Sequence, residues 1–171
     1  AAEDPATPWR SISRALTGQG GLAEGDTLIV RAGTYEGGFL VDRPGVRLVG
    51  QGMPTIAVAN PGTTVLRVGA ERVVLEGLRL SGGLRGVLAQ AASGLVLRDL
   101  EIAGHAQAGI EIEAASGALV ERVSTEGGTH GLRAEEAPGL VVRGLRSDGP
   151  SANGIFLVAS DDPVIDSNRV V

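Results

Sequence analysis

The stretch Gly94–Ser116, GLVLRDLEIAGHAQAGIEIEAAS, decides the fold, because three flanking stretches of 22 or 23 residues repeat its pattern almost position by position. These stretches cover residues 72–93, 117–138 and 139–161, and a fifth repeat begins at Asp162. A sustained period of this length is typical of a solenoid, in which each repeat buries its apolar side against its neighbours. The sequence therefore predicts a stack of coils.

Alternation of apolar and polar residues inside each repeat predicts two short strands, in which every second side chain faces the interior. Equivalent strands of successive coils would pair in parallel, about 4.8 Å apart, so that like positions form columns. The inward columns are Val73, Leu95, Ala118, Leu140; Leu75, Leu97, Val120, Val142; Leu78, Leu100, Val123, Leu145; Val87, Ile110, Leu132, Ile155; and Ala89, Ile112, Ala134, Leu157. Asn168 falls in the Leu78 column, where we expect its amide to hydrogen-bond along the stack.

A glycine precedes the second strand in each regular repeat. The four positions are Gly86, Gly109, Gly131 and Gly154. Only a residue without a Cβ adopts positive φ readily, so we interpret this column as one recurring turn.

The ends of the chain differ from the regular repeats. Residues Trp9–Leu16 place Ile12, Ala15 and Leu16 at helical spacing, and a short helix there would cover the first coil. We therefore expect an N-terminal cap over residues 1–25 and β-helix coils over residues 26–171. The final coil stops less than halfway through its turn, which indicates a truncated C-terminal end.

Three segments carry a family resemblance: Pro8–Leu16, Gly25–Tyr35 and Gly45–Gly50. With the repeats, they make the chain similar to the right-handed parallel β-helix repeat family of the pectate-lyase-like superfamily. The resemblance implies an all-β, single-stranded right-handed parallel β-helix with a short N-terminal capping helix. It also implies a carbohydrate-related role, with an extracellular or periplasmic location.

The composition of the chain excludes several kinds of binding partner and of chemistry. The net charge of -5 argues against nucleic acid as a partner, because phosphate binding needs a basic surface. No apolar run approaches the roughly 18 residues that cross a membrane, so no membrane insertion is expected. All 15 basic residues are Arg and Cys is absent, which removes chemistry that needs a Lys base or a thiolate.

Enzymes of the resembled family act mainly on acidic polysaccharides, and their motifs match this chain poorly. Thr129-His130-Gly131 and Asp161-Asp162 are similar to two polygalacturonase motifs, but they occur in reversed order. On a solenoid, reversed order puts the groups on the wrong coils, whereas hydrolysis needs two carboxyl groups around one bond. Arg43-Pro44 is a faint match to a lyase with an Arg base, without a matching Asp cluster for Ca²⁺.

The best candidate site comes from outward positions of the second strand. One outward column is Leu88, Glu111, Arg133, Phe156, and the next is Gln90, Glu113, Glu135, Val158. Glu111 and Arg133 should pair between adjacent coils. Glu113 and Glu135 should repel one another unless a cation or Arg133 relieves them. His130 lies beside them, next to Gly131.

These residues have two interpretations. They form either a binding patch for a sugar or small cation, with His130 ready for proton transfer, or a solvated sheet face with a surface ion pair worth about 0 to 1 kcal/mol. The predicted binding residues are Glu111, Glu113, His130, Arg133, Glu135 and Phe156. No cofactor is expected, although the Glu113–Glu135 pair is compatible with Ca²⁺.

Two further features affect the surface. His105 lies in the variable turn 104–107, where we expect an exposed loop residue. An apolar column falls at positions that should face outward: Val74, Val96, Leu119, Val141 and Val164. Either a bend turns these side chains inward, which we favour, or another chain covers them. Self-association could accordingly be face-to-face, or end-to-end through an open last coil.

Three functions remain open. The leading interpretation is a β-helix module that binds carbohydrate or protein, without complete catalytic machinery in this chain. The alternative is a lyase or glycoside hydrolase acting on uronate polysaccharide. The third is a purely structural solenoid.

Overall fold

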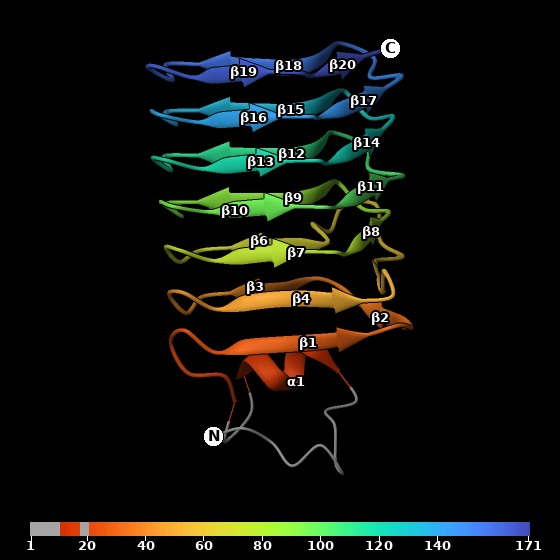
Figure 1. Ribbon diagram of the computed structural model, residues 1–171. Coiled ribbons are helices and arrows are strands. Elements are labelled where there is room, and N and C mark those ends of the chain that lie inside the picture. Colours follow the sequence, from red (N-terminus) through yellow and green to blue (C-terminus); the bar gives the residue numbers. More distant parts are fainter. Residues whose placement is uncertain (1–10, 18–20) are drawn as a thin grey trace.

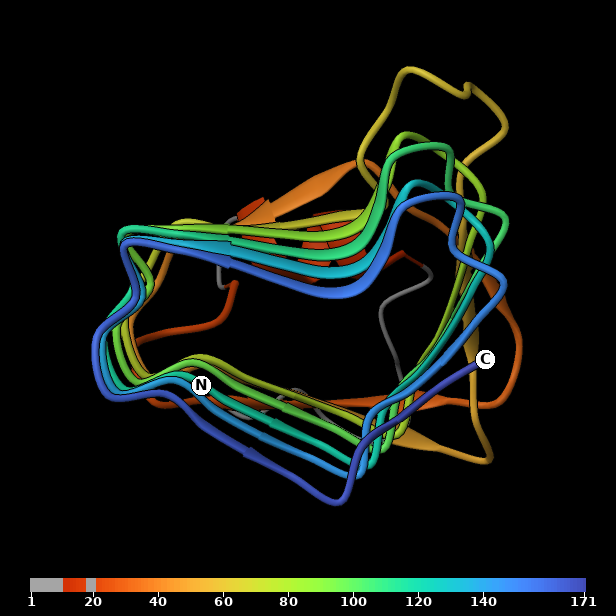
Figure 2. The same cartoon turned by 90° about the horizontal axis from the view of Figure 1, so that it is seen from above.

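The computed structural model describes residues 11–17 and 21–171, and these residues form a right-handed parallel β-helix. The coils stack along one axis in Figure 1. Seen from above in Figure 2, each coil runs along three sides, so three parallel sheets enclose the interior. The stack of coils predicted from the repeat, and the parallel β-helix that the resemblance implied, are both confirmed.

Each sheet takes one strand per coil, and all its strands pair in parallel. Sheet A contains β1 (Thr27–Arg31), β4 (Arg47–Gln51), β7 (Val74–Glu76), β10 (Val96–Arg98), β13 (Leu119–Glu121), β16 (Val141–Arg143) and β19 (Val164–Asp166). Sheet B contains β2 (Thr34–Glu36), β5 (Thr55–Ala57), β8 (Arg79–Ser81), β11 (Glu101–Ala103), β14 (Ser124–Glu126), β17 (Arg146–Asp148) and β20 (Arg169–Val170). Sheet C contains β3 (Phe39–Val41), β6 (Leu66–Val68), β9 (Arg85–Gln90), β12 (Ala108–Glu113), β15 (His130–Glu135) and β18 (Asn153–Val158).

The predicted inward columns form the core, although their last members in sheet C, Ile155 and Leu157, are only partly buried. Leu75, Leu97, Val120 and Val142 are in register and fully buried. The first predicted strand of each repeat is, however, two strands, one in sheet A and one in sheet B. A residue with positive φ separates them, such as Asp99 (φ 51°) between β10 and β11. This left-handed residue turns the chain from one sheet to the next.

The glycine column before the second strand has a different cause from the one predicted. Gly86, Gly109, Gly131 and Gly154 are absent from the residues with positive φ, so they are not the turn. A Cβ on Gly109 would instead lie 2.6 Å from Thr125 Cγ2 and 2.8 Å from the carbonyl oxygen of Gly131. Sheet C meets the next coil so closely here that only hydrogen fits.

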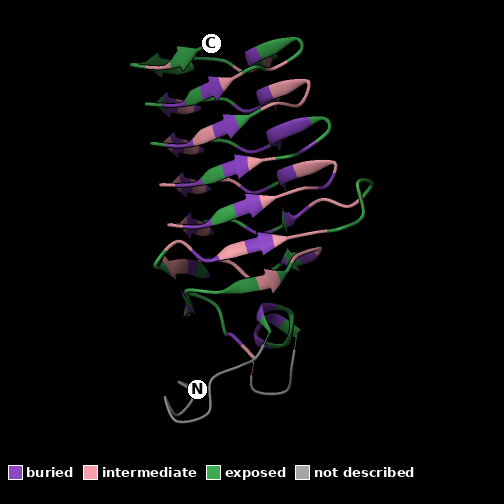
Figure 3. Cartoon of the chain, turned by 90° about the vertical axis from the view of Figure 1, so that its right-hand side faces the viewer, coloured by how far each residue is buried: buried purple, intermediate pink, exposed green. Residues whose placement is uncertain are grey.

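The predicted cap is present as α1 (Ile12–Thr17), which lies beneath the first coil in Figure 1. Its residues Ile12, Ala15 and Leu16 are buried, as the helical spacing predicts. Trp9 lies outside the described residues. At the opposite end, β19 and β20 are exposed throughout (Figure 3). No helix among the described residues is long and apolar enough to cross a membrane.

Asn168 bonds along the stack as predicted. Its Oδ1 accepts from the Leu145 N–H at 2.7 Å, and its Nδ2 donates to the Val142 carbonyl at 3.0 Å. Both partners belong to the preceding coil, so this amide ties the last coil to its neighbour.

Two expectations about the surface are wrong. His105 is buried, with 3% of its surface exposed, because its ring fills the space below Gly128 of the next coil. The apolar column of sheet A is not turned inward: Val74, Val96, Leu119 and Val141 stay on the outer face and are half-buried. Their stacked side chains cover one another, so no bend is needed.

Candidate functional site

The predicted outward columns lie side by side on the outer face of sheet C. Leu88, Glu111, Arg133 and Phe156 are in register across β9, β12, β15 and β18. Gln90, Glu113, Glu135 and Val158 are in register beside them. Figure 2 shows the turns between sheets B and C projecting outward at one edge of this face. All six predicted site residues therefore belong to one surface.

Glu111 is the most enclosed polar residue of this surface, with its side chain only 4% exposed. It pairs with Arg85 of the coil below and with Arg133 of the coil above, whose Nη1 lies 2.6 Å from Glu111 Oε1. A buried carboxylate needs such partners, because desolvation disfavours its charge. The two arginines hold Glu111 in one position.

Arg133 connects the three carboxylates of the surface. Besides Glu111, its guanidinium contacts Glu135 Oε2 at 2.5 Å and Glu113 Oε1 at 3.7 Å. Burial lowers the pKa of Arg133, but the nearby carboxylates outweigh burial and raise this pKa above its ordinary value. Arg133 therefore relieves the repulsion between Glu113 and Glu135, which is one of the two possibilities that the sequence left open.

His130 and Phe156 form a flat aromatic platform beside the carboxylates. Their ring centroids are 5.3 Å apart and their planes differ by 13°. Phe156 is directly in register with Arg133, and 37% of it is exposed. The buried His130 Nδ1 has no hydrogen-bond partner in the part of the chain that the structure describes. The platform places apolar surface next to hydrogen-bonding groups.

Sequence reasoning missed Arg85 and the contact made by Gln90. Gln90 Nε2 donates to Glu113 Oε2 at 2.7 Å. Arg85 precedes Gly86 just as His130 precedes Gly131, so the repeat itself places Arg85 in the His130 column. Comparing the residue that precedes this glycine in every repeat would therefore have identified Arg85 from the sequence.

Arg133, rather than a cation, contacts these carboxylates in the structure. Among residues 11–17 and 21–171, no group of three or more His, Asp or Glu side chains is arranged to hold a metal ion. Arg133 occupies the position between the carboxylates where a cation would otherwise be needed.

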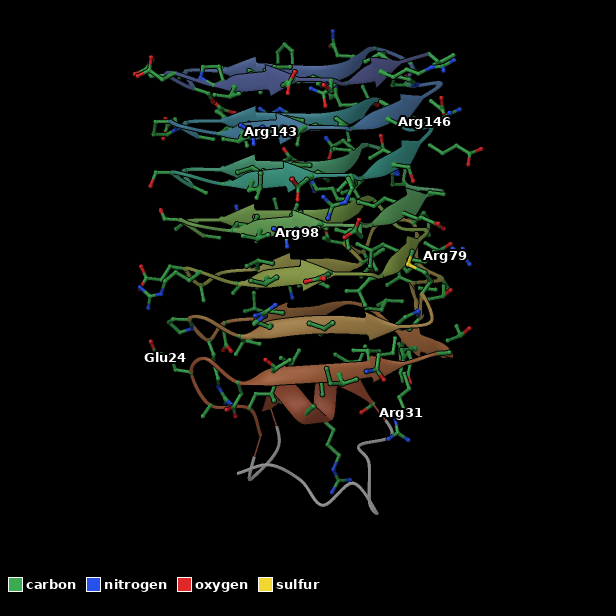
Figure 4. The ribbon with its side chains drawn as sticks, viewed as in Figure 1. Glu24, Arg31, Arg79, Arg98, Arg143 and Arg146 are labelled. Atoms are coloured by element: carbon green, nitrogen blue, oxygen red, sulfur yellow. The ribbon has the colours of Figure 1, made fainter. Side chains whose placement is uncertain are left out.

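The outer faces of sheets A and B present mostly paired surface charges. On sheet A, Glu76, Arg98, Glu121 and Arg143 alternate in register, and Arg98 lies 3.0 Å from Glu121. On sheet B, Arg79 contacts Glu101 at 2.7 Å, and Arg146 contacts Asp148 at 2.6 Å. Figure 4 shows the labelled arginines of both sheets at the outside of the coils. Exposed pairs of this kind contribute about 0 to 1 kcal/mol each.

An open depression of about 400 Å³ lies at the corner between sheets A and B. It is lined in part by Asp99 and Arg122, which form a bidentate pair with contacts of 2.7 and 2.9 Å. This hydrogen bonding lowers the pKa of Asp99. Asp99 and Arg122 thus satisfy one another at this corner. Sheet C differs, because several carboxylates gather there around one arginine.

The fold is shared with solved structures of low sequence identity. An alginate lyase from Paenibacillus sp. str. FPU-7 superposes with a TM-score of 0.72 at 17% identity, over 93% of this chain and 72% of that one. A candidate glycosyl hydrolase from Parabacteroides merdae ATCC 43184 gives 0.77 at 10% identity, over 98% and 91%. A pectin methylesterase in complex with a hexasaccharide gives 0.53 at 10%, over 90% and 63%.

No protein-family profile matches the sequence, and neither does any curated protein. The structural likenesses confirm the right-handed parallel β-helix that the sequence resemblance implied. At these identities they show the fold alone.

Proposed function

We propose that this chain is a glycan-binding β-helix module, and that the outer face of sheet C contacts the polysaccharide. The surface in this proposal consists of Glu111, Glu113, His130, Arg133, Glu135 and Phe156, of which the buried Glu111 holds Arg133 in position for contact. One observation carries it: Glu111 is buried on an outer face, fixed between arginines of the coils below and above. Such rigid placement of polar groups is typical of a recognition surface.

The aromatic platform supports the choice of a glycan. A sugar ring has an apolar face edged by hydroxyl groups, and the His130–Phe156 stack offers apolar surface beside carboxylate acceptors. The flat sheet continues over several coils, which suits an extended polymer. The neighbours named as an alginate lyase and a pectin methylesterase add support. An extracellular or periplasmic location is part of the proposal, because such polymers lie outside the cell.

The second candidate is an enzyme, a lyase or glycoside hydrolase on uronate polysaccharide. The observation that favours it is the gathering of three carboxylates and His130 on one face. Incubation with pectate and alginate should release unsaturated products or reducing ends if this candidate is right. Loss of that release in Glu135→Ala and His130→Ala would place catalysis on sheet C, and no release from the unaltered protein would exclude these substrates.

Binding is tested by affinity electrophoresis and calorimetry against a polysaccharide panel. Phe156→Ala should weaken binding at least tenfold, because it removes the upper ring of the platform. Leu40→Ala is the matched control: Leu40 lies in the same outward column, is 40% exposed, and sits on β3 at the far end of sheet C. Equal effects of the two substitutions, or no binding to any glycan, would contradict the proposal.

A further inference from the structure

Between β9 and β18, the outer face of sheet C carries more negative than positive charge; Arg67 of β6 lies outside this part. The carboxylates of this part are Glu111, Glu113 and Glu135, and its guanidinium groups are Arg85 and Arg133, which leaves one net negative charge. A repulsive surface of this sign disfavours a polymer that bears a carboxylate on every sugar.

The two arginines are already engaged. Arg85 pairs with Glu111, and Arg133 holds Glu111 and Glu135 at 2.6 and 2.5 Å. A uronate carboxylate that took the place of Glu135 on Arg133 would displace that carboxylate and lie beside Glu113. Both steps cost free energy, because a displaced carboxylate and two like charges replace a satisfied ion pair.

The carboxylates at the rim remain accessible as acceptors. The side chains of Glu113 and Glu135 are 34% and 41% exposed, and they come from adjacent coils. A carboxylate accepts hydrogen bonds from hydroxyl groups in several directions, and these charge-assisted bonds are strong. Hydroxyl groups of a sugar are donors that this surface can satisfy without disturbing its ion pairs.

We infer that the ligand of this face is an uncharged glycan, whose hydroxyl groups donate to Glu113 and Glu135 while its ring packs against Phe156. This inference rests on the proposed glycan-binding function and restricts its ligand. Polyuronates, which the family resemblance favours, are disfavoured by the charge of this face.

The first test compares two sets of polymers at pH 8 and low ionic strength. The uncharged set is laminarin, galactomannan and xyloglucan, and the anionic set is polygalacturonate and alginate. Binding to one of the uncharged polymers, with none to the anionic set, supports the inference. Preferential binding to a polyuronate would overturn it and leave the proposed function standing, whereas no binding to either set would overturn the proposed function itself.

The second test reverses the charge balance of the site. Glu113→Gln combined with Glu135→Gln releases Arg133 from these two carboxylates, although Glu111 still holds it, and makes this part of the surface net positive. Binding of the uncharged polymer should then fall roughly tenfold, since charge-assisted hydrogen bonds become neutral ones, and binding of polygalacturonate should appear.

The matched control changes the net charge of the protein equally but on another face. Glu36→Gln combined with Glu126→Gln removes two exposed carboxylates from the outer face of sheet B. Thermal unfolding of both double variants verifies that they are folded. If the control also gains polygalacturonate binding, overall charge rather than the sheet C surface governs selection, and the inference fails.

Discussion

At the residue scale, glycines serve two distinct purposes in this fold. Gly117 has φ +64° and open space around its Cβ position. Gly131 has ordinary φ, but a Cβ there would meet Ser147 Oγ and lie 2.6 Å from the carbonyl oxygen of Gly154. The backbone of the next coil cannot move aside as a side chain can. The contact at Gly131 should therefore tolerate a larger side chain less well than the positive φ at Gly117 does.

We therefore expect Gly131→Ala to cost about 3 kcal/mol of unfolding free energy, the upper range for overpacking, and Gly117→Ala about 1 kcal/mol. Urea unfolding of the two variants measures the difference. A larger loss for Gly117→Ala would mean that backbone conformation, rather than contact between coils, fixes the glycine column.

His105 gives the protein a pH-dependent stability. Burial lowers the pKa of its imidazole in the folded state, and the nearby backbone carbonyls of Gly127 and His130 only partly offset this. Between this lowered value and the ordinary pKa of about 6.5, the unfolded chain binds more protons. Stability should therefore fall as pH drops below about 6.5.

The melting temperature of His105→Gln, compared with that of the unaltered protein from pH 8 to pH 5, isolates the effect. The His105→Gln curve should decline less on acidification. Parallel curves over the whole range would show that protonation of His105 does not oppose folding.

At the element scale, β9, β12 and β15 are linked across their outer face by Glu111. Removing this carboxylate leaves Arg85 and Arg133 partly buried without their shared partner. Breaking such an enclosed ion pair is costly, and we expect Glu111→Ala to lose about 3 kcal/mol. Glu101→Ala, which breaks an exposed pair with Arg79 on sheet B, should lose less than about 1 kcal/mol. Similar losses in chemical denaturation would contradict the special role of Glu111.

The sequence predicted which site residues lie side by side on sheet C. In a parallel sheet paired in register, residues one repeat apart in the sequence become neighbours on adjacent strands. Glu111, Arg133 and Phe156 follow from that rule alone. The burial of His105 does not, because it depends on the missing side chain of Gly128 one coil later. The third strand of each coil also escaped prediction, since the left-handed residue before it is Gly77 or Gly144 in two repeats but Asp99 or Arg122 in the other two, so that no glycine column marks the turn.

The glycine column shows a second limit. Positive φ and close approach both select glycine, so its recurrence at Gly109 and Gly131 cannot distinguish them. Only the spatial relation of β12 and β15 to Thr125 and Ser147 of the following coils does so.

At the scale of the whole molecule, each coil contacts only its neighbours, and stability should vary along the axis. The central strands β9, β12 and β15 are buried between coils on both sides, whereas β19 and β20 are exposed. Native-state hydrogen exchange should be slowest in the central strands and fastest in β19 and β20. Uniform protection from β4 to β20 would indicate a single cooperative unit instead.

The central claim is that a glycan contacts the outer face of sheet C. Nuclear magnetic resonance of ¹⁵N-labelled protein, titrated with laminarin, galactomannan and xyloglucan in turn, tests where contact occurs. We expect the polymer that binds to shift amide signals within β12, β15 and β18, centred on Glu111, Arg133 and Phe156. Shifts centred on Val96, Leu119 and Val141 of sheet A would contradict it.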